Sequence, residues 1–120
     1  MQYAVLLYAD VSPDAGPGDP DWDASAEAHQ AFNARIGELG LEKLSSAALH
    51  GTARATSLRR RSGERLLTDG PFAETKEQLW GFHILEAPDL DAVLDVTEKL
   101  WEAEHGTVEI RPVVRIRMPA

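Results

Sequence analysis

The chain contains no cysteine, which excludes disulfides, thiolate zinc sites, iron–sulfur clusters and a cysteine nucleophile. It also lacks a long hydrophobic run. The longest uncharged apolar stretch, Tyr3 to Ala9, is far shorter than the roughly 20 residues that a membrane-spanning helix needs. The N-terminus has neither a basic segment nor a small-residue cleavage site, so it does not resemble a signal peptide. We therefore expect a cytoplasmic protein with no membrane partner.

Basic residues are scarce. The 12 lysines and arginines face 20 aspartates and glutamates, and the formal net charge is −8. A nucleic-acid-binding surface needs positive charge to neutralise phosphates, so we expect no nucleic-acid partner. Residues 54–65 are the exception, because they hold five arginines and a single acid. This stretch is either a solvated face or a patch that holds an anionic ligand.

Several catalytic signatures are also missing. The chain has no Gly-x-Ser-x-Gly elbow and no glycine-rich phosphate loop. The four histidines are His29, His50, His83 and His105, and no two of them lie about four residues apart on one predicted helix. The sequence therefore predicts neither a bound metal nor an organic cofactor.

The length of 120 residues fits one domain, residues 1–120. Residues 2–9 and 79–86 are apolar at nearly every position rather than at alternate ones, which is typical of central strands covered on both faces. Simple alternation assigns the side chains of the second of these strands to two faces. One face is expected to hold Trp80, Phe82 and Ile84, and the other Leu79, Gly81, His83 and Leu85.

Apolar residues spaced three or four apart predict helices from Trp22 or Asp23 to Leu39 and from Asp89 to Glu104. A long loop rich in proline and glycine precedes the first helix. The remaining predicted elements are strands at 43–50 and 107–117 and a hairpin formed by 52–60 and 65–68. This order predicts an α+β fold, a ferredoxin-like split βαβ subunit with an inserted hairpin.

Two helices cover only one face of such a sheet, yet two of its strands are apolar on both faces. The chain has no further element to cover the second face. We therefore expect a homodimer in which two sheets pack face to face around a two-fold axis.

His29 lies within the apolar stripe of the first predicted helix. It is either a core histidine satisfied by one hydrogen bond or a general acid/base at the mouth of a cleft, for which a pKa near 6.5 is well suited. Asp69, on the turn before Gly70 and Pro71, is the candidate carboxylate that orients the imidazole. Its alternative role is an Asx-turn.

Four further residues are expected to bind a small-molecule substrate. Tyr8, at the end of the first strand, and Ser46 would form hydrogen bonds with a polar substituent of a ring. Phe72 and Trp80 would supply aromatic surface. Core packing is the alternative role of Tyr8 and Trp80.

The stretch Thr68 to Leu79 (TDGPFAETKEQL), followed by Gly81 and Phe82, resembles the signature of YCII-related proteins of the DGPF type. The ending from His105 to Val113 (HGTVEIRPV) resembles the closing strand of the same family, and the opening Tyr3 to Tyr8 also fits. The resemblance covers most of the chain.

The resemblance implies a dimeric α/β barrel and a histidine–aspartate pair in a cleft. The family histidine precedes the glycine that ends the first helix by eleven residues, as His29 precedes Gly40. Asp69 is the matching aspartate. Ser45 and Ser46 stand where many DGPF sequences have glycines, which alters the cleft.

The family resemblance implies two kinds of function. One branch resembles lyases that eliminate chloride from hydroxylated aromatic rings, which suggests a cofactor-independent lyase or isomerase that uses His29 and Asp69. Other members resemble accessories of extracytoplasmic-function sigma factors. The alternative is therefore a non-catalytic ligand-binding or regulatory module.

Overall fold

The structure is a computed structural model and describes residues 1–115. Its elements, in chain order, are β1 (Gln2–Ala9), α1 (Pro20–Glu38), β2 (Glu42–Ala48), the 3₁₀ turn η1 (Thr52–Arg54), β3 (Thr56–Arg61), β4 (Glu64–Asp69), β5 (Gln78–Glu86), α2 (Leu90–Thr97), α3 (Trp101–His105) and β6 (Gly106–Pro112). Four strands form an antiparallel sheet in the order β2-β5-β1-β6. This order confirms the ferredoxin-like α+β fold. The predicted end of the last strand, Arg117, lies outside the described residues.

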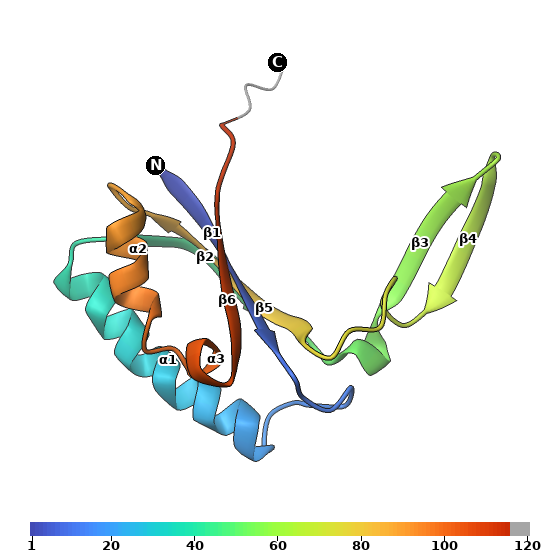
Figure 1. Cartoon of the computed structure of the whole chain (residues 1–120), viewed down its shortest axis with the longest axis horizontal. Helices are drawn as coiled ribbons and strands as arrows, with labels where there is room; N and C mark the ends of the chain where they lie inside the picture. Colours follow the sequence, from blue (N-terminus) through green and yellow to red (C-terminus); the bar gives the residue numbers. More distant parts are fainter. Residues whose placement is uncertain (116–120) are drawn as a thin grey trace.

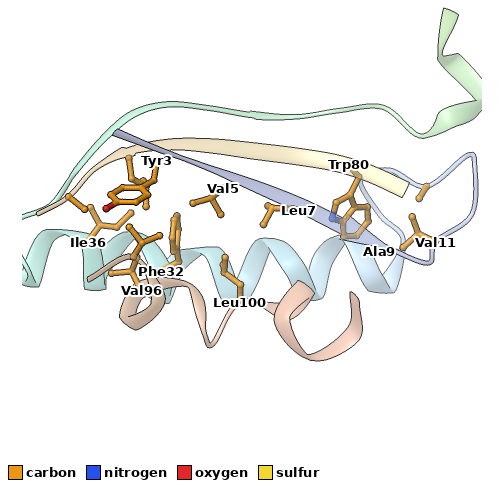
Figure 2. Packing of buried hydrophobic residues seen from close by; sticks show 14 residues of the cluster. Tyr3, Val5, Leu7, Ala9, Val11, Phe32, Ile36, Trp80, Val96 and Leu100 are labelled. Carbon is orange, nitrogen blue, oxygen red and sulfur yellow. The ribbon is translucent and has the colours of Figure 1, made fainter. Parts of the chain in front are cut away.

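The core lies between the sheet and the helices. Alternate residues of β1 are buried against the helices, at Tyr3, Val5, Leu7 and Ala9, because successive strand side chains point to opposite faces. Figure 2 shows these side chains above the helical layer, which contributes further core residues. The helical contribution comes from Phe32 and Ile36 of α1, Val93 and Val96 of α2, and Leu100. The predicted stripe of the first helix is thus confirmed at its centre.

Simple alternation is wrong for β5, because a β-bulge interrupts its pairing with β1. Leu7 pairs with Gly81 and Tyr8 with Leu79, so Trp80 is the extra residue. The bulge turns Trp80 to the helix face, where it is only 5% exposed and shares that face with His83. Leu79 is placed on the opposite face, and 39% of it is exposed.

The second predicted helix is not continuous. The backbone of Leu100 is extended (φ −63°, ψ 146°), so α2 ends at Thr97 and α3 begins at Trp101. The Thr97 hydroxyl donates to the Val93 carbonyl, which is the kind of side-chain bond that disturbs a helix. The break buries both Leu100 and Glu102, whereas an unbroken helix would turn only the stripe residue Leu100 inward.

The predicted hairpin forms a separate two-stranded sheet, β3–β4, which we call the arm (residues 56–69). Figure 1 shows the arm projecting away from the four-stranded sheet. The radius of gyration is 16.3 Å, against about 14 Å for a compact chain of this length. Ser62 and Gly63 form its turn with positive φ, and Leu58 and Leu67 pair on one face with 64% and 55% of their surfaces exposed.

Within residues 1–115, all three helices lie on one face of the four-stranded sheet (Figure 1). The other face, which we call the open face, carries apolar side chains at its centre. Ala4, Leu6, Phe82 and Ile84 lie there and are only partly shielded by their neighbours. Tyr8 and Leu79 extend this surface toward the arm.

Candidate functional site

A cavity of about 270 Å³ opens on the helix side of the sheet, between α1, β2, β5 and α3. It contains both polar and aromatic side chains. The polar and aromatic lining residues are Trp22, Ser25, His29, Asn33, Lys43, Ser46, Trp80, His83 and Glu102. Three of the residues singled out in the sequence, His29, Ser46 and Trp80, therefore share one cavity. We call it the histidine cavity.

The backbone of α1 sets the orientation of His29. Its Nδ1 atom lies 2.7 Å from the carbonyl oxygen of Ser25, one helical turn earlier. A carbonyl oxygen only accepts hydrogen bonds, so Nδ1 carries the proton of this bond. In a neutral imidazole the basic lone pair then resides on Nε2, which points toward the sheet.

His29 Nε2 meets His83 Nε2 of β5 at 3.0 Å. Burial, together with the smaller effects of the neighbouring His29 and Lys43, lowers the pKa of the His83 imidazole to about 4. His83 is therefore neutral near pH 7, and its Nε2 hydrogen is donated to the Nε2 lone pair of the His29 tautomer that Ser25 holds. Its Nδ1 atom is buried and has no hydrogen-bond partner among the described residues.

Glu102 is a functional candidate that the sequence reasoning missed. Its side chain is fully buried, and its Oε2 atom accepts hydrogen bonds from Ser25 Oγ at 2.7 Å and Trp80 Nε1 at 3.0 Å. The other oxygen, Oε1, is buried and has no partner in the described part of the chain. In the sequence Glu102 was one of several acids of a predicted helix, and no local pattern marked it as buried.

The structure does not bring His29 to Asp69. Asp69 ends β4 in the arm and lines a second cavity of about 1000 Å³, together with Tyr8 and Phe72. The acceptor that orients His29 is the Ser25 carbonyl, and its side-chain partner is His83. Sequence reasoning had joined His29 and Asp69 through a pattern of residue types, whereas Asp69 is the last residue of β4, in the arm that Figure 1 shows projecting away from the sheet, and it does not line the histidine cavity.

The second cavity differs from the histidine cavity in the side chains that line it. The Tyr8 hydroxyl donates to Glu109 Oε1 at 3.1 Å. Partial burial raises the pKa of this phenol, and the bond to Glu109 raises it further. Phe72 is 78% exposed at the edge of this cavity. Tyr8 is therefore held as a neutral hydrogen-bonding group, and the two predicted ligand-binding residues lie apart from His29.

Among residues 1–115, no three histidine, aspartate or glutamate side chains gather closely enough to hold a metal ion. None of the helices formed by these residues combines the length and apolarity that crossing a membrane requires.

Comparison with known proteins agrees with the sequence signature. Residues 1–117 match the YCII-related domain family. An uncharacterized protein of Rhizobium meliloti (strain 1021) is 38% identical over 116 residues, which cover 94% of this chain and 92% of that protein. The chain therefore belongs to the YCII-related family.

Proposed function

We propose that this chain is a small-molecule enzyme of the lyase or isomerase type, in which His29 transfers a proton within the histidine cavity. The observation that carries the proposal is the 2.7 Å contact between His29 Nδ1 and the Ser25 carbonyl oxygen, which makes Nε2 the proton acceptor beside a cavity large enough for a small ring compound. Imidazole is suited to this work because its ordinary pKa lies close to neutral pH.

The proton transfer follows from the hydrogen bonds of His29. The Ser25 carbonyl holds Nδ1–H, so the lone pair of Nε2 is available once a substrate displaces the His83 N–H. A hydroxyl or an activated C–H of the substrate then gives its proton to Nε2. In an isomerisation the same proton returns to a different atom. In an elimination the electron pair left on the substrate expels an anion such as chloride.

A non-catalytic ligand-binding module is the second candidate. It is favoured by the hydrogen bond from His83, which occupies the lone pair that a general base needs. In this case the two histidines would only supply hydrogen bonds to a ligand. The two candidates differ in whether a bound compound exchanges protons with water.

Hydrogen exchange in D₂O tests the enzymatic proposal directly. Resorcinol, hydroquinone and chlorohydroquinone are incubated with the protein, and deuterium at ring carbons is measured by NMR and chloride release by ion chromatography. We expect exchange or chloride release above the buffer rate for at least one compound, because ring protonation passes through a keto form that an acid/base pair stabilises. Rates equal to buffer for all three compounds would leave only the binding module.

We also propose that a second copy of this chain covers the open face. Ala4, Leu6, Phe82 and Ile84 form an uncharged centre, so two identical faces meet across a two-fold axis without opposing like charges there. The charge of the arm also favours a second copy of this chain as the partner. Five of the twelve basic residues lie in or beside the arm, while the chain as a whole carries a charge of −8, so the acid-rich body of a second copy complements the arm.

Light scattering tests this assembly. The wild-type protein is expected to show twice the 13.2 kDa mass of one chain at micromolar concentration. Leu6→Glu places two carboxylates in the centre of the buried contact, so this variant is expected to be monomeric. Leu94→Glu on α2, where 45% of the leucine is exposed on the helix side, is the matched control and remains dimeric. A monomeric wild-type protein would contradict the proposal.

A further inference from the structure

The histidine cavity has a carboxyl group at one end. Glu102 lines this end with a fully buried side chain, and its Oε1 atom has no hydrogen-bond partner among residues 1–115. Its other oxygen is fully occupied by the donors Ser25 and Trp80. A buried acceptor without a partner is unfavourable, so a ligand that donates a hydrogen bond to Oε1 removes this penalty.

The opposite end carries a positive charge. Lys43 Nζ donates to Asn33 Oδ1 at 2.8 Å, and both residues line the cavity. The ammonium group remains exposed and keeps two further donors. An anionic group on a ligand would pair with it.

The positions of the lining residues along α1 and along β2 show which residues lie at each end of the cavity. On α1, Ser25, His29 and Asn33 are four residues apart, so they share one face and span about 12 Å. On the sheet, Lys43 pairs with Leu85 and lies at the Asn33 end of this row. Ser46 pairs with His83 beside His29, so β2 lies alongside the row in the antiparallel direction. The cavity therefore leads from the carboxyl of Glu102, past the two histidines, to the ammonium of Lys43.

We infer that the histidine cavity binds a small ring compound that has a hydroxyl or amino donor at one end and an anionic group at the other. The donor pairs with Glu102 Oε1, and the anion pairs with Lys43. The ring lies beside Trp80, which Trp22 meets edge to face at 5.8 Å. This inference rests on the proposed function for the choice of cavity, and it places the middle of the ligand at His29.

Binding of three matched probes tests the inference by calorimetry near neutral pH. 4-Aminophenylacetate carries both groups, phenylacetate lacks the donor, and 4-methylaniline lacks the anion. We expect the dissociation constant of 4-aminophenylacetate to be at least about tenfold lower than that of either other probe, which is the usual effect of a hydrogen bond to a charged group. Equal affinity of all three probes, or no binding up to about 10 mM, would overturn the inference.

Glu102→Gln sharpens the test. Ser25 and Trp80 both donate to the same atom, so they hold the amide oxygen of glutamine there and turn its NH₂ group toward the ligand. Two donors then oppose each other, and 4-aminophenylacetate is expected to bind no better than phenylacetate. Glu104→Gln, on the same helix with 82% of the side chain exposed, is the matched control and retains the difference. Retention of the full difference by Glu102→Gln would refute the donor contact.

Lys43→Met tests the other end without disturbing a buried group. It is expected to remove the advantage of 4-aminophenylacetate over 4-methylaniline, while Lys99→Met, which lies outside this cavity, leaves it unchanged. An unchanged preference in Lys43→Met would refute the anionic contact, even if Glu102→Gln failed to fold. Because these are binding measurements, they can succeed where hydrogen exchange fails, and the reverse also holds.

Discussion

Replacing His29 with glutamine lowers the catalysed rate of ring-proton exchange by about 100-fold or more. Glutamine can fill the space and keep a hydrogen bond to the helix, but its amide does not take up a proton near pH 7. In wild-type protein the Ser25 carbonyl holds Nδ1–H of His29, which leaves Nε2 as the proton acceptor. The measurement is the initial rate of deuterium incorporation into the responsive compound, compared at equal protein concentration.

His105→Gln is the control for this replacement. His105 ends α3, with 49% of its side chain exposed, and it stacks on Trp101 outside the lining of the histidine cavity. The rate of ring-proton exchange with the His105→Gln variant should match that of the wild-type protein. A rate within a few-fold of wild type for His29→Gln would show that His29 does not carry the proton, whatever the cavity binds.

Acidification from pH 6.5 to about 4 destabilises the wild-type protein by about 2 kcal/mol more than it destabilises His83→Gln. The pKa of His83 is about 4 in the folded chain, while an unfolded histidine has its ordinary value of 6.5. Within this interval the unfolded chain binds a proton that the folded chain does not bind. The contribution of neutral His83 is therefore complete above pH 6.5, and it is lost as the pH falls toward 4.

Urea unfolding at several pH values measures this difference. The free energy of unfolding of the wild-type protein should fall more steeply below pH 6.5 than that of His83→Gln. The two curves should run parallel above that pH. His105→Gln should follow the wild-type slope, because its side chain is half exposed. Parallel curves for wild type and His83→Gln across the whole range would mean that burial does not keep His83 neutral.

The low pKa of His83 also matters for the proposed proton transfer. A positive charge on both imidazoles at once would be energetically costly, because their Nε2 atoms are only 3.0 Å apart. Because His83 remains neutral, a proton taken up by His29 is the only positive charge of the pair. His29 can then donate its Nε2 hydrogen to the substrate, because Nε2 of neutral His83 already carries a hydrogen and does not accept one.

Local patterns in the sequence predicted the order of strands and helices, except for the break between α2 and α3 and the 3₁₀ turn at Thr52–Arg54. The apolar stripe of residues 22–39 and the apolar runs at 2–9 and 79–86 depend only on neighbours a few residues away. They predicted the ferredoxin-like fold and placed His29 on the face of α1 that meets the sheet, as the structure confirms. The family signature at 68–79 was also visible directly in the sequence.

The arrangement of the candidate site depended on contacts between distant residues. His29 and His83 are 54 positions apart, and Ser25 and Glu102 are 77 apart. The bulge that turns Trp80 inward exists only because β5 pairs with β1, and the break at Leu100 alone made Glu102 a buried residue. Asp69, by contrast, ends β4 in the arm and does not line the histidine cavity. The sequence by itself thus determined most of the elements and, apart from the bulged end of β5, their apolar faces, since these follow from local periodicity. Only the tertiary structure decided which polar side chains share a cavity, since long-range pairing and burial set that choice.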